Sequence, residues 1–175
     1  EEEFLELSRA YKILSDPKLR ARYDKQSGRL HPFLEAAKAG DLSALMGFEL
    51  RDPPPSVTDR HGSNALHYAS GSGAPAPVLS YLVDSLGLEV DGTTAEKRTT
   101  SSLRTPLHWA ARNGRTEAAK WLVSRGADPT RPTSDGTTAV HWSLWNGHTS
   151  TCEWLVSVGC DVNAVNDFSC NAGHF

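Results

Sequence analysis

The chain has 175 residues, of which 38% are hydrophobic and 22% charged, and its formal net charge is −3. This length suits one domain or a short array of small units, and the apolar content excludes wholesale disorder. Duplex nucleic acid binding needs a dense Lys/Arg face, which a mildly acidic chain does not offer, and no run of about 18 apolar residues is present to span a membrane. We therefore expect neither nucleic acid nor a membrane as partner.

The cysteines and the first residues of the chain indicate the cellular compartment in which the protein is expected. Three cysteines cannot all pair with one another and none belongs to a C-x-x-C motif, so neither a disulfide framework nor a zinc ribbon is expected. The chain opens with Glu1-Glu2-Glu3 rather than a basic and then apolar segment, so no secretory signal is expected at this end. We interpret the chain, which lacks an initiator Met, as a fragment of a cytoplasmic protein, with the nucleus left open. The cysteines are Cys152, Cys160 and Cys170.

The first thirty residues predict two short helices separated by a break. An apolar residue recurs every three or four positions across residues 2–14, which is typical of an amphipathic helix. Asp16 can cap the start of a second helix, over about residues 17–25, because Pro17 suits the first helical position. The apolar positions of the first helix are Phe4, Leu7, Tyr11 and Leu14.

This segment closely resembles the last two helices of a J-domain, as in Hsp40 co-chaperones. The residues that carry the resemblance are Ala10-Tyr11-x-x-Leu14-Ser15-Asp16-Pro17 and Arg22-Tyr23-Asp24. The resemblance implies that residues 1–30 are the C-terminal part of an incomplete J-domain. In that family a basic helix and a His-Pro-Asp loop contact Hsp70, and both would lie upstream of Glu1. His31-Pro32-Phe33 is not that loop, because it follows the helices and has Phe where Asp is required.

Glycine and histidine recur with a period of 33 residues through the rest of the chain. Each series contains one gap of 41 residues, so a single insertion of eight residues explains both. Longer strings align as well: Thr105-Pro-Leu-His-Trp-Ala-Ala111 lies over Thr138-Ala-Val-His-Trp-Ser-Leu144, with Asn64-Ala-Leu-His-Tyr-Ala-Ser70 above and Asn171-Ala-Gly-His-Phe175 below. The two series are Gly40, Gly73, Gly114 and Gly147, and His67, His108, His141 and His174.

A 33-residue period with a T-P-L-H-x-A core is the signature of the ankyrin repeat. Residues 31–175 strongly resemble that family, which implies an all-α solenoid of helix-turn-helix repeats with β-turn loops, preceded here by the short J-domain-like helix pair. A single pair cannot bury its apolar face, so neighbouring repeats must stack. The expected repeats are about 31–57, 58–98 with the insertion, 99–132, 133–165, and 166–175, which is truncated.

Local signals predict where the helices of these repeats begin and end. Thr105 can cap a helix that starts at Pro106, and Gly114 ends it because Gly readily adopts the left-handed conformation. A second helix with an amphipathic pattern follows. The polar stretch around Gly92–Ser102 predicts an enlarged, mobile loop. In the first repeat, Leu34 stands in place of the histidine.

The histidines do not form a metal site. They lie one per repeat, about 10 Å apart, whereas zinc ligands lie about 2 Å from the ion. We interpret His67, His108 and His141 as structural, since this histidine hydrogen-bonds within and between repeats in the ankyrin family. His148 and Cys152 lack a second pair to complete a metal site. The sequence contains no serine elbow, phosphate loop, zinc-protease motif or dinucleotide turn, so we expect no catalytic residue, cofactor or metal, and a non-enzymatic protein.

Two residues leave alternatives open. The turn Asp161-Val162-Asn163-Ala164 has the form that some ankyrin proteins present to an asparaginyl hydroxylase, but we favour a turn residue whose side chain bonds local backbone. Trp145 aligns with Arg112, at a position where ankyrin repeats vary and face their partners. An aromatic there is either a binding hot spot or packs against the rest of the fifth repeat. With that repeat truncated, the adjoining side of repeat four is expected to leave an apolar patch.

The resemblance implies protein–protein interaction, with a partner of unknown identity bound on the concave surface through turn tips and inner helix ends. The alternative is the client-selecting part of an Hsp70 co-chaperone, and a third possibility is an enzyme whose catalytic domain lies beyond Phe175. The candidate contact residues are Arg60, His61, Ser63, Arg104, Arg112, Asn113, Ser134, Asp135, Thr137, Trp145, Asn146, Asp167 and Phe168.

Overall fold

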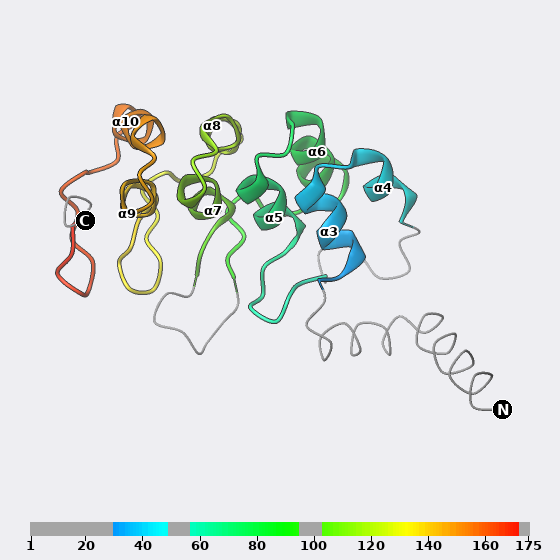
Figure 1. Ribbon diagram of the computed structural model, residues 1–175, viewed down its shortest axis with the longest axis horizontal. Helices are drawn as coiled ribbons and strands as arrows, with labels where there is room; N and C mark the ends of the chain where they lie inside the picture. Colours follow the sequence, from blue (N-terminus) through cyan, green and yellow to red (C-terminus); the bar gives the residue numbers. More distant parts are fainter. Residues whose placement is uncertain (1–29, 49–56, 95–102, 172–175) are drawn as a thin grey trace.

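A computed structural model describes residues 30–48, 57–94 and 103–171, and these ranges contain helices but no strand. The helices form two rows, an inner row of α3, α5, α7 and α9 and an outer row of α4, α6, α8 and α10 (Figure 1). Each inner helix packs against the next, as predicted for stacked helix pairs. The bounds are α3 Pro32–Ala39, α4 Leu42–Gly47, α5 Ala65–Ser72, α6 Ala76–Ser80, η2 Tyr81–Ser85, α7 Pro106–Arg112, α8 Thr116–Ser124, α9 Ala139–Trp145 and α10 Thr149–Ser157.

Some predictions concern residues outside the described ranges. The J-domain-like helices, expected over residues 2–14 and 17–25, lie there. So does most of the loop expected around Gly92–Ser102, of which only the first residues, up to Thr94, are described. These predictions therefore stay predictions.

The inner helices α5, α7 and α9 begin with reciprocal hydrogen bonds between a cap residue and a histidine three positions later. At α7, Thr105 Oγ1 accepts a bond from His108 N at 3.4 Å, while His108 Nδ1 accepts one from Thr105 N at 3.1 Å. Backbone N–H groups that the helix itself leaves unpaired are thereby satisfied. The predicted start of this helix at Pro106 is confirmed.

Gly114 makes the turn from α7 into α8 at a place where no side chain fits. Its φ is 65°, in the left-handed region. A Cβ on Gly114 would lie 2.6 Å from Nδ1 of His148. Gly147, the equivalent residue of the next repeat, has a φ of 74° but nothing within 4 Å of such a Cβ. Glycine is therefore required at Gly114 both for the backbone conformation and for the close approach.

The core runs through the array as a stack of aliphatic side chains. Each inner helix contributes a buried leucine or valine, and each outer helix contributes a leucine with no exposed surface. Burying one such side chain favours folding by about 1.5–3 kcal/mol. Leu34, which replaces the histidine in α3, is fully buried as well. The inner set is Leu66, Leu107 and Val140, and the outer set is Leu45, Leu82, Leu122 and Leu155.

The insertion between repeats two and three is divided between two places. The turn before α7 closes from Thr94 N to Arg104 O, ten positions on, whereas the turn before α9 closes from Thr133 N to Thr137 O, four positions on. This turn thus holds six of the eight extra residues. The other two lie in the outer segment of repeat two. One precedes α6, since its cap Pro75 lies two positions after Gly73 whereas Arg115, the cap of α8, directly follows Gly114. The other lies in η2, because a π-helix takes in one extra residue. Most of the insertion thus lies where the sequence predicts it, around Gly92–Ser102.

Candidate partner-binding surface

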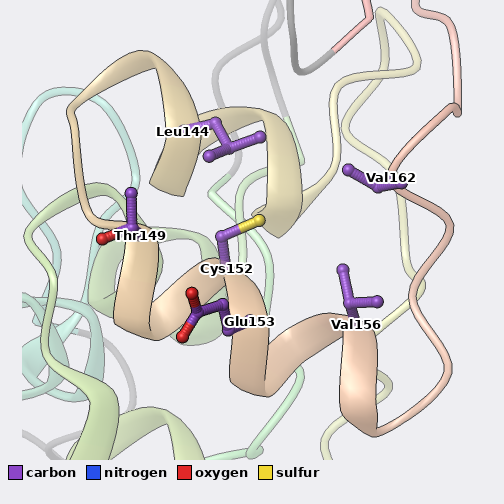
Figure 2. Close-up of a pocket in the computed structure, with 6 residues that line it drawn as sticks. All are labelled: Leu144, Thr149, Cys152, Glu153, Val156 and Val162. Carbon is purple, nitrogen blue, oxygen red and sulfur yellow. The ribbon is translucent and has the colours of Figure 1, made fainter.

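An open depression of about 460 Å³ lies between α9, α10 and the segment after α10 (Figure 2). Its lining is mostly apolar, and Val162 keeps 39% of its surface exposed. The apolar patch predicted beside repeat four is therefore confirmed. In a solenoid a further repeat stacks on this side, so we do not assign the depression to a partner. The lining residues are Leu144, Thr149, Cys152, Glu153, Val156 and Val162.

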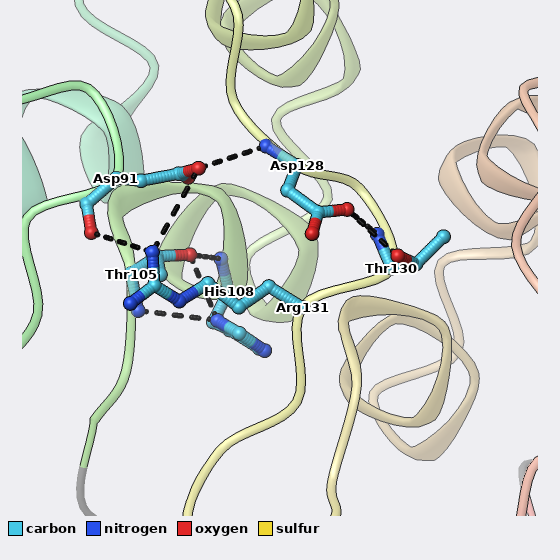
Figure 3. Close-up of polar contacts among 6 residues, drawn as sticks. All are labelled: Asp91, Thr105, His108, Asp128, Thr130 and Arg131. Carbon is cyan, nitrogen blue, oxygen red and sulfur yellow. Dashed lines mark hydrogen bonds and ion pairs between the residues drawn. The ribbon is translucent and has the colours of Figure 1, made fainter.

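The histidines of the repeats lie inside the array, and His67 and His141 join one repeat to the next. Nδ1 of His67 accepts a bond from Asn64 N at 3.3 Å, so Nε2 carries the proton and donates to Arg104 O at 3.0 Å, in the following turn. Figure 3 shows the corresponding contact of Thr105 with His108 in the next repeat. The predicted structural role, with bonds within and between repeats, is confirmed.

Burial keeps His67 and His108 neutral at physiological pH. It lowers the pKa of His67 to about 4 and that of His108 to about 4, although bonds to backbone carbonyls act in the opposite direction. His141 is equally buried and its Nε2 bonds Ala164 O at 2.9 Å. Because each ring is enclosed and already bonded to its own repeat or the next, the histidines serve packing rather than surface chemistry.

The aromatic residues next to the histidines pack across repeats. The rings of Tyr68 and Trp109 have their centroids 5.2 Å apart. Trp109 lies close over Gly71, where an added Cβ would meet its ring at 3.0 Å. The hydroxyl of Tyr68 donates to Asp59 Oδ2 at 2.7 Å, and burial together with this bond raises the pKa of Tyr68. One aromatic residue recurs beside each histidine, as at Tyr68, Trp109 and Trp142; this regular placement predicts packing between repeats, and the contact of Tyr68 with Trp109 confirms it for this pair.

Trp142, the next aromatic of this row, brings together two predicted contact residues. The guanidinium carbons of Arg104 and Arg112 lie 5.1 Å and 5.2 Å from the centre of its ring. These distances are typical of cation–π contacts. Arg104 precedes α7 and Arg112 ends it, so α7 presents both side chains to Trp142 of α9. Sequence reasoning assigned Trp142 to packing alone; the arginines at both ends of the preceding helix are the signal that it missed.

Trp145 is half-buried beside this cluster. Its ring centroid lies 5.9 Å from that of Trp142 and 5.3 Å from that of His141. Its Nε1 donates to Asn171 O at 3.4 Å, at the start of the next repeat. Trp145 thus packs toward the fifth repeat, which is the second of the two alternatives given by the sequence. Part of its side chain is exposed and can also contact a partner.

Three predicted contact residues are buried, and one of them, Asp135, bonds its own turn. Ser63 and Thr137 are 1% exposed, and Asp135 is 6% exposed. The Asp135 carboxylate accepts bonds from Thr133 Oγ1 at 2.5 Å and Thr137 N at 3.2 Å. Burial raises the pKa of Asp135, these bonds lower it, and the net shift is downward. Thr137 Oγ1 accepts a bond from Asn166 Nδ2 at 3.2 Å, and the Ser63 hydroxyl is enclosed with no hydrogen-bond partner among the described residues. The prediction of partner contact is wrong for these side chains, because the packed chain covers them.

The remaining predicted residues keep exposed or half-buried side chains. Asn113 Nδ2 donates to Trp109 O at 2.9 Å, and Asn146 makes the same bond one repeat later, so both also close helix ends. We call these remaining residues, together with Trp142, the inner surface. Those exposed are Arg60, Arg112, Asn113, Ser134, Asn146, Asp167 and Phe168, and those half-buried are His61, Arg104 and Trp145.

The described parts of the chain offer neither a metal site nor a membrane span. No three His, Cys, Asp or Glu side chains lie together in a way that would hold a metal ion there. Within the same residues, every helix is too short or too polar to cross a bilayer.

A family model described as "Ankyrin repeats (3 copies)" matches residues 33–133 and residues 95–166. The matched residues cover more than half of the chain and contain nearly all of the described helices. They include the inner surface except Asp167 and Phe168. The match begins after the J-domain-like segment, whose resemblance therefore stays a prediction.

Proposed function

The chain belongs to the ankyrin-repeat family, whose repeats generally mediate protein–protein interaction, and from this premise we propose that it is a scaffold that binds a protein partner on its inner surface. In this proposal the inner surface is the concave side of a solenoid with repeats at about 31–57, 58–98, 99–132, 133–165 and 166–175. The chain acts by binding, without catalysis.

One observation supports this proposal most strongly. Cationic, aromatic and amide side chains lie together on the inner surface, and hydrogen bonds between repeats hold the backbone beneath them in place. His67 and His141 each bond the backbone of a following turn. A surface that is already ordered loses little conformational entropy when a partner binds. Arginine and tryptophan are also the residue types most enriched at binding hot spots, and Arg112, Trp142 and Trp145 lie here.

The test is a binding measurement with a purified partner, obtained by affinity capture with the full-length protein. We expect Arg112→Ala to weaken the dissociation constant about tenfold. Lys120→Ala is the matched control, because Lys120 is exposed on the outer helix α8 and, among the described residues, pairs with Glu117. If Lys120→Ala weakens binding and Arg112→Ala does not, the partner uses the outer row and the proposal is wrong.

The motif between Phe4 and Asp24 favours a second candidate, the client-selecting part of an Hsp70 co-chaperone. Residues 1–175 contain no His-Pro-Asp sequence, so we expect this chain not to stimulate Hsp70 ATPase in a single-turnover assay. The full-length parent protein should stimulate it if the candidate is right. Several-fold stimulation by the chain itself would contradict our expectation.

We also propose an intracellular, reducing location for the protein. Cys152 and Cys160 are free, buried thiols, and burial raises the pKa of both, so they stay protonated and unreactive. Unpaired cysteines of this kind are common where thiols are kept reduced. Fractionation of cells that express the tagged full-length protein tests this location.

A further inference from the structure

We propose that Arg104 and Arg112, gathered on Trp142, form a recognition site for the carboxylates of an acidic, extended segment of the partner protein. This inference rests on the proposed scaffold function and names the chemical class of its partner. It concerns one part of the inner surface, where α7 and α9 meet.

The spacing of the two arginines fits an extended peptide. Both guanidinium carbons lie slightly more than 5 Å from the same ring centre, so they are at most about 10 Å from each other. In an extended peptide, side chains two positions apart point the same way and are separated by about 7 Å. Two acidic residues in alternate positions therefore match the two arginines. The exposed guanidinium of Arg112 can donate two parallel N–H bonds to a carboxylate.

Arg112 also differs from the arginines at the outer edge of the array. Arg131 lies 3.9 Å from Asp91 Oδ2 (Figure 3), and Arg125 pairs with Asp84. Those arginines reach an aspartate of the preceding repeat and so join neighbours. Within residues 30–48, 57–94 and 103–171, by contrast, no carboxylate pairs with Arg112. Its charge is available to a ligand, while its contact with Trp142 limits where the guanidinium lies.

The surroundings favour a peptide over a nucleic acid. Trp142 and Trp145 present aromatic surface beside the arginines, which suits the apolar side of a peptide residue between two acids. Nucleic acid binding depends on many cations that displace counterions along the backbone, whereas the chain carries a net charge of −3. A small cationic and aromatic site on a mildly acidic protein therefore points to carboxylates presented by a protein segment.

The test measures fluorescence anisotropy of a labelled peptide of alternating glutamate and serine on the chain of residues 1–175. A peptide with glutamine in place of glutamate is the matched probe and should bind at least about tenfold more weakly. Arg112→Gln should weaken binding of the glutamate peptide about tenfold, and Arg112→Lys should restore part of the loss because it keeps the charge without the fork. Arg115→Gln, an equal loss of charge in the loop between α7 and α8, should change little.

Several outcomes would overturn the inference. These are equal binding of the glutamate and glutamine peptides, equal weakening by Arg115→Gln and Arg112→Gln, or displacement by an oligothymidylate of matched charge at lower concentration than by unlabelled glutamate peptide. Circular dichroism of each variant shows that it is folded. If the glutamate peptide does not bind but binding of a purified partner still depends on Arg112, the carboxylate inference is wrong and the scaffold proposal is kept.

Discussion

The inner and outer helix rows are held in place by different interactions. Inner helices α5, α7 and α9 start with capping boxes, and their buried histidines bond neighbouring backbone. In the outer row, α4 is capped by Asp41, which accepts a bond from Ala44 N, but α6, α8 and α10 have no side-chain bond at their caps. Their places depend on buried leucines and on exposed ion pairs such as Arg125 with Asp84.

The difference explains where the array tolerates irregularity. A buried hydrogen bond is directional, and breaking it leaves an unpaired polar group, so it specifies one position. Apolar contact is less selective, so a helix can shift or take in a residue while its leucines stay buried. The π-helix η2 lies in the outer row, whereas the described inner helices are regular. Perturbing the two rows separately tests this contrast.

Acidification should destabilise the inner row. The pKa of His67 and of His108 is about 4 in the folded chain and 6.5 in the unfolded one, so the unfolded chain binds more protons between these values. Stability is therefore lost as pH falls below 6.5, by about 2 kcal/mol per histidine at pH 5. Urea denaturation at pH 7 and pH 5 measures the loss. His67→Leu, which copies Leu34, should reduce the pH dependence; an unchanged midpoint in the wild type would contradict the prediction.

Gly114→Val should cost about 3 kcal/mol of unfolding free energy, because it combines left-handed strain with a clash against His148. Gly147→Val is the matched control. It imposes the same backbone strain in open space and should cost about half as much. Chemical denaturation compares the two. Equal losses of unfolding free energy would show that His148 moves away from the side chain added at Gly114 without measurable cost.

Thr105→Ala should cost about 1–2 kcal/mol, because it removes the cap of α7 and leaves His108 Nδ1 without its hydroxyl partner. Arg115→Ala changes the corresponding position of α8, where no side-chain bond exists, and should cost much less. Thermal denaturation of both variants measures the contrast between rows. If Arg115→Ala is the more damaging, capping does not distinguish the rows.

Arg125→Ala should have the smallest effect, at most about 1 kcal/mol. Its ion pair with Asp84 is partly exposed and screened by salt, and its contact with Trp121 adds little at the surface. Denaturation at low and high salt should show the difference shrinking as salt rises. A larger loss of stability that salt does not change would show that a specific polar interaction holds the outer row in place.

Much of the fold could be predicted because its signals are local. The 33-residue period, the Thr-Pro start of α7 and the glycines at helix ends act within a few residues of their own position. The histidine, repeated in each layer, pointed to structural bonds and not to metal ligands. For the same reason the apolar end of repeat four followed from the pattern of one repeat alone.

The contact residues were less predictable, because exposure depends on how a turn folds back on itself. Ser63, Asp135 and Thr137 occupy turn positions that resemble contact sites in sequence, yet their side chains point inward. A polar residue in a turn either faces solvent or bonds local backbone, and the sequence pattern is the same in both cases.

Sequence alone thus establishes the repeat, the helix starts and ends and the buried histidines, since each depends on short-range bonding and periodic burial. The contact of Arg104 and Arg112 with Trp142, and the division of the insertion between the turn before α7 and the outer segment of repeat two, came only from the packed chain. These features depend on distances between side chains of different repeats. Those distances are set by how the layers stack, and no local pattern encodes them.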